Sequence, residues 1–174
     1  YHTFPTTYRF PVQGWKIHIS ARIDNSERVL AKVSSLLEKN EIAFKFALDL
    51  NVLMTINFKN WYRGASGKFI TIYPQKMKQF CQIIQCLHEE LEGEEGPYIL
   101  SDKRYKNSKV VYYRYGGIAN KQRLLITGEK EPVIYDPEGN PIEDKRTPFF
   151  NPPTWVFDPF IEVGEKEEKA EKEK

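Results

Sequence analysis

The chain has 174 residues, of which 40% are hydrophobic and 14% aromatic, enough to bury the core of one domain. Lys and Arg number 26 against 24 Asp and Glu, so the formal net charge is only +2. This balance excludes a protein that binds polyanions through its overall charge, and any cationic site must come from local clustering. Because no signal peptide or long apolar segment is visible, we expect a cytoplasmic protein that does not bind a membrane.

The first predicted strand, residues 15–20, alternates between apolar and polar side chains. Neighbouring residues of a strand point to opposite faces of the sheet. The odd-numbered residues are therefore expected in the core, whereas Lys16 and His18 share the other face. A helix follows, with candidate caps at residues 24–26 and an apolar stripe that ends near Asn40.

The next predicted strand, residues 42–46, repeats this pattern, because Lys45 lies between Phe44 and Phe46, which we expect to be buried. The elements that follow are a short helix (48–57), a glycine-bearing loop (60–67), a strand (68–73) and a helix (75–92). Cys81 and Cys86 lie five residues apart on this last helix, where their side chains do not meet. We therefore expect both cysteines to be reduced.

After a break at Gly96-Pro97 the pattern changes to strands separated by turns. The elements predicted here are strands at 109–115, 122–126 and 132–135, and an extended strap at 147–160 that is rich in proline and aromatic residues. The sequence thus predicts an α+β fold: a single domain with a mixed, largely antiparallel β-sheet and flanking helices. We place this domain at residues 1–164 and assign residues 165–174, almost all Lys and Glu, to a charged tail or linker.

The predicted strands bring cations onto one sheet face, with Lys16, His18 and Lys45 pointing away from the core. A cluster of cations on a rigid sheet face, which forms the floor of the predicted site, suits an anionic ligand such as phosphate. The same Lys and His side chains can also serve as an acid and a base. The sequence shows no spaced set of His and Cys residues that would indicate a metal site.

Five stretches, in order along the chain, resemble the N-terminal lyase domain of class III lanthipeptide synthetases. They are GWKIHIS (14–20), FKF (44–46), RGASGKFITIYP (63–74), GPYILSDKRY (96–105) and YRYGG (113–117). The class IV enzymes carry a similar domain. More distantly, the chain resembles the phosphothreonine lyases that some bacterial pathogens inject into host cells.

In those synthetases a kinase domain phosphorylates Ser and Thr of a precursor peptide. The lyase domain eliminates the phosphate to leave dehydroalanine or dehydrobutyrine, and a cyclase domain adds Cys thiols. The chain itself lacks the glycine-rich loop and the His-Arg-Asp motif of a kinase. The resemblance therefore implies one carbon–oxygen lyase domain whose partners are the phosphorylated precursor and the kinase and cyclase domains of the same synthetase. It implies no metal and no organic cofactor, and no nucleic-acid partner.

The resemblance also assigns roles to individual residues. Lys45 is the general base that removes the α-proton, and His18 is the general acid that protonates the leaving phosphate. Tyr73 helps to position the substrate near the peptide carbonyl. The phosphate-binding residues are Lys16, Lys68, Arg104, Arg114 and Arg63.

These roles require particular protonation states. A free lysine has a pKa of about 10.4, so we expect neighbouring cations and partial burial to lower the pKa of Lys45. His18 must carry a proton, which a bound phosphate dianion would favour through its opposite charge.

Three alternatives remain open. The chain is compatible with a phosphopeptide-binding module that keeps the cationic pocket without chemistry, although binding alone needs neither a base nor an acid. The Tyr112–Tyr115 run is compatible with a nucleic-acid stacking platform, which the nearly neutral chain and the lack of a nucleic-acid motif disfavour. Arg104 has a simpler explanation as the ion-pair partner of Asp102.

Overall fold

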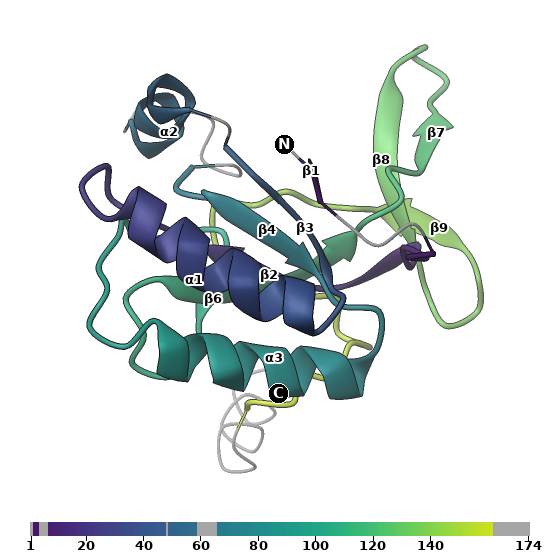
Figure 1. Ribbon diagram of the computed structural model, residues 1–174. Helices are drawn as coiled ribbons and strands as arrows, with labels where there is room; N and C mark the ends of the chain where they lie inside the picture. The colour runs from purple at the N-terminus through teal and green to yellow at the C-terminus, as the bar shows by residue number, and fades with distance from the viewer. Residues whose placement is uncertain (1, 4–6, 48, 59–65, 162–174) are drawn as a thin grey trace.

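The computed structural model describes residues 2–3, 7–47, 49–58 and 66–161. Within these residues, three helices and two antiparallel sheets build the fold (Figure 1), which confirms the α+β prediction. The helices are α1 (Ser26–Lys39), α2 (Leu50–Asn57) and α3 (Met77–Glu90). The strands are β1 (His2–Thr3), β2 (Gln13–Ile19), β3 (Ala43–Phe46), β4 (Ile70–Tyr73), β5 (Lys103–Arg104), β6 (Val111–Gly117), β7 (Gln122–Leu124), β8 (Lys130–Tyr135) and β9 (Pro141–Glu143).

The larger sheet has the strand order β1-β3-β4-β2-β6-β5, and all neighbouring strands are antiparallel. Its central strand β2 pairs with β6 over its whole length, from Gln13 to Ile19, and with β4 from Ile17 to Ile19. Both Lys16 and His18 therefore lie on an inner strand of the sheet; His18 has a paired residue on each side, and Lys16 is paired with β6.

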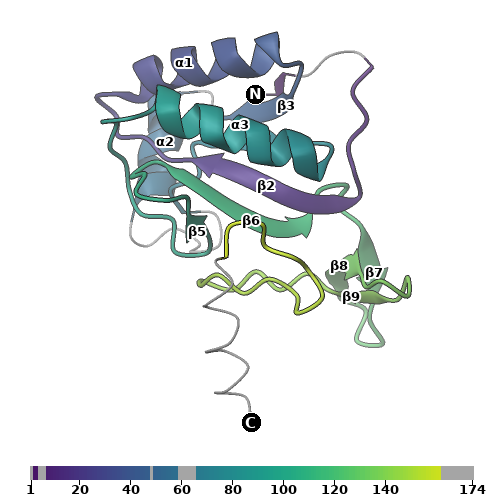
Figure 2. The same ribbon diagram turned by 90° about the horizontal axis from the view of Figure 1, so that it is seen from below.

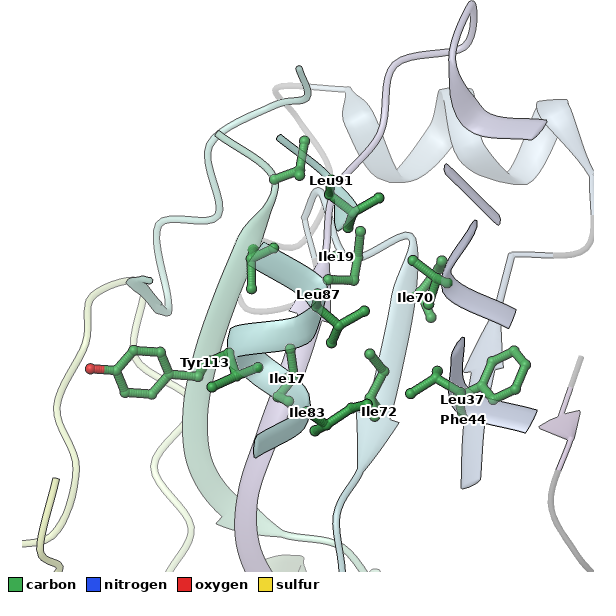
Figure 3. Packing of buried hydrophobic residues seen from close by; sticks show 14 of the residues in the cluster. Ile17, Ile19, Leu37, Phe44, Ile70, Ile72, Ile83, Leu87, Leu91 and Tyr113 are labelled. Atoms are coloured by element: carbon green, nitrogen blue, oxygen red, sulfur yellow. The ribbon is translucent and has the colours of Figure 1, made fainter. Parts of the chain in front are cut away.

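The apolar face of this sheet packs on α1 and α3, which lie side by side over it (Figures 1 and 2). Trp15, Ile17 and Ile19 of β2 are at most 5% exposed, as the alternating pattern predicts. Figure 3 shows Ile17 and Ile19 beside Ile83 and Leu87 of α3. Burial of these side chains stabilises the fold, and it directs the even-numbered residues of β2 to the face that the two helices leave uncovered.

Several elements differ from the sequence prediction. The short strands β1, β5 and β9 were not expected, because two or three residues cannot show an alternating pattern. β4 begins at Ile70 instead of Lys68, and α3 begins at Met77 instead of residue 75. Phe46 is only partly buried, so the expectation of a buried Phe46 is wrong; it is the last residue of β3, beyond the buried Phe44.

The smaller sheet, in the order β7-β8-β9, projects from the C-terminal half of the chain (Figure 1). The side chain of Gln13 fixes it to the larger sheet: its Nε2 donates to the carbonyl of Tyr135 at 2.8 Å, and the Tyr135 N–H donates to its Oε1 at 2.6 Å. This two-point contact between β2 and β8 brings the residues after β9 toward the larger sheet.

The predicted strap is present as an irregular segment that crosses the fold after β9 (Figure 2). Its side chains Phe150, Val156 and Phe160 pack against the core. The Phe160 ring lies 5.5 Å from that of Phe80 and 5.3 Å from that of Tyr113, measured between centroids. The strap thus extends the core beyond α3.

Both cysteines, Cys81 and Cys86, are free, as predicted. The predicted charged tail falls within residues 162–174, which lie outside the described part of the chain. In the part that is described, none of the helices has the length and apolar character needed to cross a membrane.

Candidate active site

The candidate site lies on the sheet face that points away from α1 and α3. A cavity of about 570 Å³ lies on this face, within the size range of small-ligand sites. Six of the predicted site residues line the cavity: Lys16, His18, Lys45, Lys68, Tyr73 and Arg114.

The strand register places the predicted acid and base in one row across the sheet. His18 of β2 is directly opposite Thr71 of β4, and Thr71 is directly opposite Lys45 of β3. Directly opposed residues point to the same face, and neighbouring strands lie about 4.8 Å apart, so the backbones of His18 and Lys45 are about 10 Å apart. A ligand on the cavity floor therefore lies between the two side chains.

His18 is held by a buried carboxylate that the sequence interpretation missed. Its Nδ1 donates a hydrogen bond to Oδ2 of Asp102, and the side chains are 4% and 0% exposed. The other carboxylate oxygen accepts a hydrogen bond from Ser101 Oγ at 2.8 Å and lies 3.4 Å from Lys68 Nζ. This arrangement fixes the imidazole tautomer and leaves Nε2 as the nitrogen available to a ligand.

The surroundings set the charges of this pair. Burial lowers the pKa of His18 to about 4; Lys68 and Lys16 act in the same direction, and Asp102 opposes them. Burial opposes ionisation of Asp102, but the contacts with His18 and Lys68 hold its pKa well below the usual range. At neutral pH the pair is therefore a neutral imidazole that donates to a carboxylate, so the imidazole must take up the proton that the acid role requires when the ligand binds.

Two cations stand side by side on the cavity floor. Lys16 of β2 is directly opposite Arg114 of β6, and like charges in this arrangement destabilise a sheet. Lys16 Nζ donates to the carbonyl of Gly117 at 2.9 Å, and Arg114 donates to the carbonyl of Lys145. Burial lowers the pKa of Lys16 to about 8, with Asp144 opposing the shift. A bound anion would relieve the repulsion between the two cations.

The segment after β9 contributes residues that the sequence did not indicate. Asp144 accepts a hydrogen bond from the Gly117 N–H at 3.0 Å. A side chain at Gly116 would crowd this carboxylate, since a Cβ there would lie 3.2 Å from Asp144 Oδ1. Arg146 and Lys121 also line the cavity, so its described walls carry six Lys or Arg side chains and one carboxylate. The cavity is therefore strongly cationic although the chain is nearly neutral.

Lys45 lies at the open side of the cavity. Its Nζ is 6.0 Å from the centre of the Tyr73 ring, which also lines the cavity. The expectation that Lys45 is partly buried is wrong, because its side chain is exposed. Among the described residues, β3 has only the two-residue β1 outside it in the sheet, and little of this part of the fold covers the position.

Arg104 is not in this cavity. It is directly opposite Tyr112, which is directly opposite His18, so it extends the same row on the far side of the imidazole. There it lines a separate pocket of about 360 Å³ with Tyr98. The alternative explanation, an ion pair with Asp102, is wrong, because the described partners of that carboxylate are His18, Ser101 and Lys68.

Arg63, the remaining predicted phosphate ligand, lies outside the described residues. Across the described ranges, no group of three or more His, Cys, Asp or Glu side chains is placed to hold a metal ion. What the described cavity offers is a cationic floor, a histidine and an exposed lysine, which together suit an anion and proton transfer next to it.

Comparison with known proteins identifies the family. Residues 1–173 match the model of the RamC N-terminal domain, and the chain belongs to this family. It is 40% identical over 155 residues to a probable SapB synthase of Streptomyces coelicolor; the match covers 89% of this chain and 17% of that protein. The relationship to a lanthipeptide synthetase that the sequence stretches indicate is thus confirmed.

The fold also resembles that of a phosphothreonine lyase effector protein, VirA of Chromobacterium violaceum. The TM-score is 0.50 at 24% sequence identity, and the match covers 65% of this chain and 59% of that one. At this level of identity the likeness concerns the fold.

Proposed function

We propose that this domain is a phosphoserine/phosphothreonine lyase that eliminates phosphate from a precursor peptide and leaves dehydroalanine or dehydrobutyrine. The observation that carries the proposal is the row in which His18, bound to Asp102, and Lys45 lie on either side of one strand above a cationic floor. β-Elimination needs a base within reach of the α-hydrogen and an acid within reach of the ester oxygen of the leaving phosphate.

In the proposed reaction, neutral Lys45 Nζ removes the α-proton of the phosphorylated residue. The electrons of the Cα–H bond form the Cα=Cβ double bond, and the Cβ–O bond breaks with its electrons on the phosphate oxygen. His18 Nε2 gives that oxygen a proton. The products are the dehydro-residue and phosphate. His18 ends neutral, as in the free protein, and Lys45 ends protonated and returns its proton to solvent.

The substrate completes the site in two ways. A phosphate dianion near His18 favours the protonated imidazole, so the acid becomes charged as phosphate binds. The peptide also brings its α-proton to the amine of Lys45, which is exposed at the open side of the cavity. Lys16, Lys68 and Arg114 stabilise the charge that develops on the leaving phosphate, and Tyr73 positions the peptide carbonyl.

The chain spans 17% of the length of the SapB synthase that it matches. We therefore propose that it acts together with kinase and cyclase domains of a synthetase, with the phosphorylated precursor passing from the kinase to this domain. None of these steps requires a metal or an organic cofactor.

The proposal is tested by incubating the domain with a phosphoserine peptide and a thiol, followed by mass spectrometry. A product lighter by phosphoric acid, which then gains the thiol, supports the lyase. A product that has lost phosphate and gained water identifies a phosphatase and contradicts the mechanism. Unchanged peptide that still binds supports the phosphopeptide-binding module instead.

Phosphate affinity should fall as the pH rises through about 8, because Lys16 loses its proton there. One linked proton weakens binding by up to about ten-fold for each pH unit above the pKa of the free protein. Titration calorimetry with inorganic phosphate between pH 7 and 9.5 measures the effect. Lys16→Arg is the matched control, since a guanidinium stays charged in this range; an equal decline in both proteins would show that Lys16 is not responsible.

A further inference from the structure

The cavity has an apolar wall at each end of its cationic floor. Ile56 of α2 lines one part of it, and Ile118, Pro132 and Val133 line another. None of these side chains can bind a phosphate or transfer a proton, and the proposed chemistry leaves them without a role.

The hydrogen bonds around these residues show that the walls lie at opposite ends of β2. The carbonyl of Ile56 accepts from the Gly67 N–H at 2.9 Å, and the nearby Phe69 N–H donates to the Ile19 carbonyl, at the C-terminal end of β2, at 3.0 Å. Ile118 follows β6, whose last residue pairs with Gln13 at the start of β2. Lys16 and His18 lie between the two ends.

Both walls are anchored to the fold, the α2 wall through Asn57 Nδ2, which donates to the Ala21 carbonyl at 3.0 Å. The Ile118 N–H donates to the Val12 carbonyl at 2.9 Å, and the Val133 N–H donates to the Lys121 carbonyl at 2.9 Å. On α2, Val52 lies one turn before Ile56 on the same side of the helix and is 44% exposed. The apolar surface of this wall therefore continues outward from the cavity.

The length of the floor matches a short stretch of extended peptide. β2 has seven residues, and a strand rises about 3.3 Å per residue, so its ends are about 20 Å apart. A phosphorylated residue bound beside Lys16, the central residue of β2, would place neighbours within about three residues against one wall or the other.

We propose that this domain selects phosphopeptides that carry apolar side chains within three residues on both sides of the phosphorylated residue. The inference rests on the proposed lyase function, and it names the substrate class of the same cavity. Ile56, with Val52, recognises the neighbours on one side, and Ile118 with Val133 recognises those on the other.

Four phosphoserine peptides test the inference, with Leu or Asn at the second and third positions before the phosphoserine and, independently, after it. We expect Leu on each side to raise kcat/KM by about ten-fold, the effect of one well-placed apolar contact. Affinity for each peptide is measured in parallel by fluorescence anisotropy. Equal rates and affinities for all four peptides would overturn the inference and leave the lyase function intact.

The two measurements separate this inference from the proposed function. Elimination from none of the peptides would refute the lyase, whereas a ten-fold difference in affinity would still support apolar selection.

Ile56→Asn should abolish the preference on one side only, and Ile118→Asn on the other. Val52→Asn provides a second variant for the α2 wall, because its exposed side chain can change without disturbing the core. Leu124→Asn, at a 71% exposed position on β7, is the matched control and should keep both preferences.

Discussion

Replacing Lys45 with alanine is expected to lower the rate of elimination by about 10³-fold, within the range that a general base contributes. Lys45 is two strands away from His18 in the same register of the sheet. It lies outside the cluster that Lys16 forms with Lys68 and Arg114 in the cavity. Phosphopeptide affinity should therefore fall by no more than about three-fold, since the floor cations remain. Single-turnover mass spectrometry gives the rate, and fluorescence anisotropy gives the affinity.

Lys45→Arg distinguishes a base from a phosphate ligand. The guanidinium keeps the positive charge but stays protonated at any working pH. If Lys45 is the base, this variant is as inactive as Lys45→Ala. Elimination by Lys45→Arg at more than a tenth of the original rate would contradict the assignment. Lys130→Ala, at the exposed first position of β8, is the surface control and should keep full activity.

The second large effect is expected at His18. His18→Ala should slow elimination by about 10² to 10⁴-fold while weakening phosphopeptide binding far less, because the acid acts on the leaving oxygen as the bond breaks. An equal loss of rate and affinity would instead identify His18 as a phosphate ligand. Steady-state kinetics, with affinity measured separately, distinguish the two results.

Asp102→Asn tests whether the carboxylate sets the orientation and charge of His18. The variant keeps the shape but loses the charge that faces His18 and Lys68. We expect kcat to fall by about 100-fold and the pH profile to shift, because the carboxylate supports the protonated imidazole. Unchanged kcat and pH profile would show that the contact only holds the fold together. Thermal unfolding records any structural loss, since removal of one partner of a buried pair is destabilising.

Much of the fold could be predicted from side-chain periodicity. The alternation in β2 placed Trp15, Ile17 and Ile19 against the helices and Lys16 and His18 on the other face, and the structure agrees. Strands of two or three residues carry no such signal, and so β1, β5 and β9 were missed. Some helices and strands, such as α3 and β4, begin two residues after their predicted start, because the exact end of an element depends on local caps and turns.

The geometry of the site depends on strand order, which periodicity does not determine. The sequence predicts that Lys45 and His18 both point away from the core. Only the strand order β3-β4-β2 brings them into one row across the sheet. Asp102 follows a loop with no periodic pattern, so the carboxylate that holds His18 had no sequence signal beyond its place in a family motif. Asp144 and Arg146 reach the cavity because the Gln13 contact fixes a second sheet, a contact between residues far apart in the chain.

The most direct test of the central claim uses a peptide whose phosphoserine carries deuterium on the α-carbon. Elimination breaks that bond, so mass spectrometry should show a dehydro-product that contains no deuterium and has the same mass as the product of the unlabelled peptide. The Lys45→Ala variant should form it about 10³-fold more slowly. A dephosphorylated product that retains the deuterium would mean that the phosphate is removed by hydrolysis. That result would contradict the roles proposed for Lys45 and His18.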